Sequence, residues 1–188
     1  MSTVTVARSQ NVPRNSVDDP DTYAVIASLL PNEWIVRAAK ATNLVVQEET
    51  VTNWGCMPSG PPMEAEWKPV LEGFRLANAE THTFSADHAI GLPYQLVSAS
   101  TIATSLDRPI PNLVSDGWQS FWQRYPKSGG YLQLSAVGFD ALRRRAMVYV
   151  AHHCGGLCGG GMHHLFERDG AIWREVDPAG LRQCRWIS

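Results

Sequence analysis

The sequence has 188 residues, enough for one domain with a buried core that needs neither a metal nor a disulfide merely to fold. Its 16 basic and 18 acidic side chains give a net charge of −2, which does not favour a nucleic-acid or anionic-membrane partner. No apolar stretch reaches the roughly 20 residues of a membrane-spanning helix, so we expect no nucleic acid and no transmembrane segment, and the sequence indicates no other partner.

Residues 1–20 are polar and rich in Pro, Asn, Ser and Asp, which predicts a disordered tail before a single domain at 21–188. The tail lacks the apolar core of a signal peptide. As the sequence stands, a cytoplasmic location is expected. If a leader has been removed from the natural protein, a periplasmic or secreted location is expected instead, and disulfides would then be natural.

Helical patterns come mostly in the first two thirds of the chain. DPDTYAVIASLL predicts a helix that Asp19 or Asp21 caps. Residues 69–79 predict a second helix, and SDGWQSFWQRYP predicts a third, capped by Ser115 or Asp116. Strands are expected at 43–51 and 94–98, with a Pro- and Gly-rich loop at 53–62.

Alternating residues predict strands through most of the C-terminal part, including RAMVYVAHH, MHHLFERD and AIWREVD. The Asp169–Gly170 pair is typical of a two-residue hairpin turn. Residues 144–176 are therefore expected to form three consecutive antiparallel strands. With helices mostly N-terminal and an antiparallel β-meander C-terminal, the predicted fold class is α+β.

The stretch HHCGGLCGGGMHH, residues 152–164, surrounds a glycine-rich loop with histidines and cysteines. If the flanking strands pair so that His152 faces His163, these side chains and Cys154 converge on one face, because strand side chains alternate. Cys158 can then swing in from the loop. Two sulfur and two nitrogen ligands suit Zn²⁺, and thiolates also suit Cu(I). Without Cys158, the fourth position would be open for catalysis.

A neighbouring register would instead pair His152 with His164 and His153 with His163. Continuing the strands through the next turn sets His164 opposite Glu175. The Glu175 carboxylate could then orient the His164 imidazole, and the two residues would support the metal ligands without binding the metal themselves.

Two other hypotheses use the same cysteines. A Cys154–Cys158 disulfide would fix the shape of a non-enzymatic binding or interaction domain, and Cys56–Cys184 is the natural second pair in an oxidising compartment. Alternatively, Cys154 or Cys158 serves as the thiol of an enzyme, activated by the neighbouring His153. The sequence leaves metal binding and the disulfide open, and it does not establish whether the protein is an enzyme.

The stretch from FWQRYP through YVAHHCGGLCGGGMHH to DGAIW resembles the C-terminal half of a group of uncharacterised bacterial proteins. The shared pattern is YP.S.G…S.VGF…A.VYV…CG.LCG.G…L…G.W, and the resemblance covers roughly residues 118–188. It implies that the loop from Cys154 to Gly161 is a family feature and that export, and hence a disulfide, is favoured. The flanking histidines are not part of the pattern, and the resemblance implies no activity.

Overall fold

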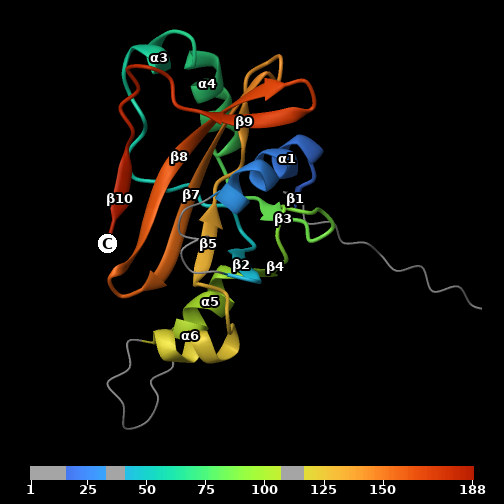
Figure 1. The fold of residues 1–188 in the computed structure, drawn as a ribbon, viewed down its shortest axis with the longest axis vertical. Coiled ribbons are helices and arrows are strands. Elements are labelled where there is room, and N and C mark those ends of the chain that lie inside the picture. Colours follow the sequence, from blue (N-terminus) through green and yellow to red (C-terminus); the bar gives the residue numbers. More distant parts are fainter. Residues whose placement is uncertain (1–15, 33–40, 107–116) are drawn as a thin grey trace, which may run out of the picture.

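The structure is a computed structural model that describes residues 16–32, 41–106 and 117–188. Within these residues, the main sheet has eight strands in the order β10-β8-β7-β5-β2-β4, with β6 also paired to β7 and β9 to β8. Strands β1 and β3 form a separate parallel pair. Figure 1 shows the long strands β7 and β8 crossing the molecule from the helices α3 and α4 towards α5 and α6.

The helices are short and lie in the first two thirds of the chain. They are α1 (Pro20–Leu29), the 3-10 helix η1 (Leu30–Asn32), α3 (Pro61–Glu64), α4 (Lys68–Ala77), α5 (Ala99–Leu106) and α6 (Trp118–Arg124). The strands are β1 (Ser16–Val17), β2 (Leu44–Gln47), β3 (Thr83–Phe84), β4 (Tyr94–Val97), β5 (Tyr131–Leu134), β6 (Gly138–Phe139), β7 (Arg145–Gly155), β8 (Cys158–Asp169), β9 (Ile172–Val176) and β10 (Arg185–Ile187). None of the helices in the described ranges is both long and apolar enough to cross a membrane.

The predicted α+β class and the predicted three-strand meander are confirmed. Strands β7, β8 and β9 follow one another with antiparallel pairing. The sheet as a whole is mixed, because β2 pairs in parallel with both β4 and β5. This parallel pairing joins segments far apart in sequence, which local alternation of residues does not reveal.

Both faces of the sheet are buried, because helices pack on each of them. On one face, Val148, Val150 and Phe166 belong to a core that includes Ile26 and Leu29 of α1. The opposite face meets two groups of helices.

Near the centre of β7, the opposite face packs Met147, Tyr149 and Leu165 against Val70 and Phe74 of α4. Farther along the sheet, Val45 and Val97 pack against Ile102 of α5 and Phe121 of α6, and together they form a third cluster.

The predicted cap of α1 is confirmed at Asp19, whose carboxylate accepts a hydrogen bond from the Asp21 backbone N–H at 3.0 Å. Arg143 pairs with both of these carboxylates, at 2.9 Å from its Nε to Asp21. Arg168 also reaches Asp21, at 3.1 Å. The start of α1 is thus fixed to the turn before β7 and to the end of β8.

The predicted tail, residues 1–20, lies mostly outside the described part of the chain. Its last five residues contradict the boundary, since residues 16 and 17 form β1 and Pro20 begins α1. Tyr23 donates a hydrogen bond to the carbonyl of Val17 at 2.8 Å, which secures this segment to the domain.

Helix α5 was not predicted, because its sequence ASTIATSL carries hydroxyl side chains that often compete with helical hydrogen bonds. Here the hydroxyls of Thr104 and Ser105 instead donate to carbonyls four residues back, at 2.9 and 2.7 Å. The carboxylate of Glu49 accepts from the Ala99 N–H at 2.8 Å and so caps the first turn. Helix α6 begins after Gly117, while the predicted capping residues Ser115 and Asp116 lie outside the described residues.

Candidate functional site

The glycine-rich stretch is mostly strand. Strand β7 ends at Gly155 and β8 begins at Cys158, so the turn consists of Gly156 and Leu157 alone. The predicted register is therefore wrong. His152 pairs with Gly160, and His163 pairs with Tyr149.

The alternative register is wrong as well. His153 pairs with Gly159 and His164 pairs with Val148, so neither predicted histidine pair forms across the hairpin. A bulge between His153 and Gly155 completes the change of register.

The new register puts His152 and His163 on opposite faces of the sheet, because neighbouring cross-strand partners share a face. His163 lies with Tyr149 on the face covered by α4, whereas His152 lies on the face of Leu132, its partner in β5. The four predicted ligands, His152, Cys154, Cys158 and His163, are therefore not brought together.

His163 is fully buried within an aromatic cage. Its ring centroid lies 5.4 Å from that of Phe74, 5.0 Å from Tyr149 and 6.3 Å from Trp54. Neither ring nitrogen has a hydrogen-bond partner within the described residues. Burial, assisted by repulsion from His164, lowers the pKa of His163 from 6.5 to about 4, so the imidazole is neutral at pH 7.

His152 has a comparable environment on the other face. It is 4% exposed, and its Nδ1 has no hydrogen-bond partner in the described part of the chain. Burial lowers its pKa from 6.5 to about 4, although a backbone hydrogen bond with Gly129 opposes the shift. Both histidines therefore behave as neutral core side chains near neutral pH.

The structure has the two disulfides Cys154–Cys158 and Cys56–Cys184, with Cα–Cα separations of 5.0 and 5.8 Å. Bridged sulfurs are not thiolate ligands or nucleophiles. Across the described ranges, no group of three or more His, Cys, Asp or Glu side chains is placed to hold a metal ion. Zinc or copper binding stays a prediction, without a ligand cluster to support it.

The expected contact between His164 and Glu175 forms, with 2.6 Å between Nδ1 and a carboxylate oxygen. The expected register was nevertheless wrong, since Glu175 pairs with Phe166 and reaches His164 along the diagonal. With the other ligands dispersed, this pair orients no metal ligand and instead links β9 to β8.

His153 is only partly buried and lies between aromatic rings. The ring of His153 stacks on Tyr131 at 4.7 Å and lies 5.4 Å from Trp186. Its Nε2 donates to Gln133 at 2.8 Å, and Gln133 in turn donates to Gln47 at 2.8 Å. Burial lowers the pKa of His153. These contacts form a row across the sheet, from Trp186 of β10 through His153 and Gln133 to Gln47 of β2.

Two glycines of the run are needed for packing rather than for a flexible loop. A Cβ on Gly161 would lie 2.5 Å from both the Trp186 Nε1 and the Tyr149 hydroxyl. These two groups form a 2.7 Å hydrogen bond directly over the glycine. A Cβ on Gly159 would lie 3.3 Å from the Trp186 ring. The glycines thus provide the surface on which β10 docks.

The end of the hairpin and β10 form one exposed corner of the sheet, at the lower left in Figure 1. We define the hairpin corner as Gly156, Leu157 and Cys158 together with Arg185–Ile187. Leu157 is 92% exposed and Ile187 is 71% exposed. Sequence analysis did not identify this surface, although a leucine at the centre of a glycine-flanked turn was a visible sign.

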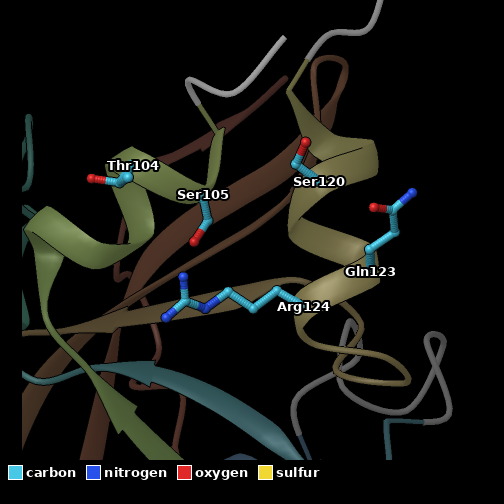
Figure 2. A pocket seen from close by; sticks show the side chains of 5 residues that line it. All are labelled: Thr104, Ser105, Ser120, Gln123 and Arg124. Carbon is cyan, nitrogen blue, oxygen red and sulfur yellow. The ribbon is translucent and has the colours of Figure 1, made fainter. Parts of the chain in front are cut away.

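The hollow shown in Figure 2 lies between α5 and α6, has a volume of about 310 Å³ and is lined by polar side chains. The Arg124 guanidinium extends from α6 beneath Ser105 of α5. It forms no ion pair within the described residues, but the hydroxyls of Thr104 and Ser105 already donate to their own helix. The hollow thus offers one exposed cation and few free donors for a ligand.

The comparisons with known proteins assign no family. No family model matches the chain, and neither a curated protein nor a solved structure matches it significantly. The resemblance of residues 118–188 to a bacterial group therefore stays a prediction.

Proposed function

We propose that this chain is a disulfide-fixed binding domain whose recognition surface is the hairpin corner. The observation that carries the proposal is that both disulfides hold the elements that form this corner. Cys154–Cys158 closes the turn around Leu157, and Cys56–Cys184 anchors the segment that leads into β10.

The side chain of Leu157 has no evident use inside the fold. Two-residue turns favour Gly, Asn or Asp, and a leucine that is 92% exposed gains nothing from burial. The disulfide that brackets it contributes about 2 kcal/mol in the chain-entropy model and fixes the turn. Presenting an apolar side chain on a rigid turn lowers the entropy lost on binding.

The other half of the corner is equally constrained. Trp186 anchors β10 by its hydrogen bond to Tyr149, so that Ile187, next along the strand, points to the opposite side and is 71% exposed. The Cys56–Cys184 bridge spans 128 residues and contributes about 5 kcal/mol in the same model.

The competing hypotheses have less support. A thiol enzyme needs a free thiolate, whereas Cys154 and Cys158 are bridged. A metal enzyme built on the hairpin needs convergent ligands, whereas His152 and His163 lie on opposite faces.

A matched pair of variants tests the proposal. Leu157→Asp places a charge on the corner, and Leu76→Asp does the same at an 80% exposed leucine of α4, which lies at the other end of the hairpin in Figure 1. Immobilised wild type and variants are incubated with whole homogenate, membranes included, from cells of the natural source. We expect a component that wild type and Leu76→Asp retain and that Leu157→Asp loses by about tenfold or more. Retention that is equal for all three proteins would contradict the proposal.

A further inference from the structure

We infer that the hairpin corner docks on an anionic lipid surface, an inference that rests on the proposed function and names its partner. The corner combines exposed apolar side chains with unpaired positive charge. Apolar groups that enter the headgroup region and cations that contact anionic lipids are the two contributions that hold peripheral proteins on membranes.

The charge of the corner differs from that of the whole chain. Residues 150–163 and 181–188 contain no Asp or Glu, and the charged side chain of the hairpin corner is that of Arg185. Arg185 is exposed and forms no ion pair within the described residues. The net charge of −2 gave no indication of an anionic-membrane partner because it averages this corner with acidic surface elsewhere.

The arrangement of the side chains suits a lipid surface. Leu157 projects from the turn, and Arg185 and Ile187 share one face of β10, since alternate residues of a strand point the same way. Trp186 points to the other side of β10, where its hydrogen bond to Tyr149 holds the strand on the sheet and keeps Arg185 and Ile187 facing outward.

The shape of the corner favours lipid over a protein partner. A specific protein interface buries roughly 1,200–2,000 Å² and has a packed apolar centre. The corner instead offers two separated aliphatic side chains at a turn and an edge strand. A lipid surface deforms around such a protrusion, so it needs no matching pocket.

Sedimentation with vesicles tests this inference on the full chain with its disulfides intact. The probes are vesicles of phosphatidylcholine alone and vesicles that also contain about 30% phosphatidylglycerol. We expect wild type to bind the anionic vesicles more tightly than the neutral ones, and added salt to weaken that binding.

The variants separate the two contributions. Leu157→Asp should weaken binding to anionic vesicles by about tenfold to a hundredfold. Arg185→Glu should weaken it by about fivefold to thirtyfold, while binding to neutral vesicles changes little. Leu76→Asp is the matched control and should bind as wild type does.

Three results would overturn the inference. They are no binding to anionic vesicles at millimolar lipid, equal binding of wild type and Leu157→Asp, and an equal loss in Leu76→Asp. If vesicles do not bind but a soluble protein is retained in a Leu157-dependent manner, the lipid inference fails and the proposed function stands. If no component depends on Leu157, both fail.

Discussion

Replacing His163 with phenylalanine should remove a defined part of the pH dependence of stability. The pKa of His163 is about 4 in the folded protein and about 6.5 in the unfolded chain. Between these values the unfolded state binds more protons, so stability falls as the pH falls from about 6.5 to about 4. The full loss is about 3 kcal/mol, of which about 2 kcal/mol is reached at pH 5.

Burial also lowers the pKa of His152 to about 4, so this residue adds a loss of similar size. We therefore expect His163→Phe to lose about 2 kcal/mol less than wild type between about pH 8 and about pH 5. Phenylalanine fits the aromatic cage and leaves no unpaired ring nitrogen, so the variant should be at least as stable at pH 8.

The assay is guanidinium unfolding at both pH values, followed by tryptophan fluorescence with the disulfides intact. Tyr149→Phe is the control, because it perturbs the cage around the same imidazole by removing the hydroxyl that accepts from Trp186, and it adds no group that titrates in this range. Its pH dependence should match that of wild type. If His163→Phe also matches wild type, the burial of a neutral histidine does not account for the acid sensitivity.

Three further variants test the construction of the hairpin corner. Gly161→Ala should destabilise the protein by about 1–3 kcal/mol through steric overlap under β10, whereas Gly156→Ala, with no atom within 4 Å, should change stability by less than about 0.5 kcal/mol in chemical unfolding. The double variant Cys154→Ser and Cys158→Ser should lose about 2 kcal/mol in the same assay, and no loss would mean that the bridge does not constrain the turn. Leu157→Asp should unfold within about 0.5 kcal/mol of wild type, because its side chain is 92% exposed, and a larger loss would show a structural role.

Features that depend on local sequence were predictable. Alternating residues identified β7, β8 and β9, and an aspartate before a proline and an apolar periodicity identified α1 with its cap. These features follow from neighbours along the chain, which a single sequence displays directly.

The site depended on where the hairpin turns, and local sequence did not determine that. The glycines from Gly159 to Gly161 were interpreted as loop, but they are strand residues. At Gly159 and Gly161 the missing side chain makes room for Trp186, some 25 residues later. Because the turn lies at Gly156 and Leu157, His152 pairs with Gly160, three residues before the expected partner His163. Because strand faces alternate, that odd shift sent His163 to the other face and dispersed the ligands.

The most direct test of the hairpin corner is a photo-crosslinking side chain placed at position 157, compared with one at position 76. Benzophenone reacts with both proteins and lipids, so the experiment does not presuppose the partner. Cell homogenate with membranes is irradiated with each labelled chain, and the products are identified by mass spectrometry. We expect products at position 157, among them phospholipid adducts, that do not form at position 76. The same products at both positions, or none at position 157, would contradict the assignment of the corner as the binding surface.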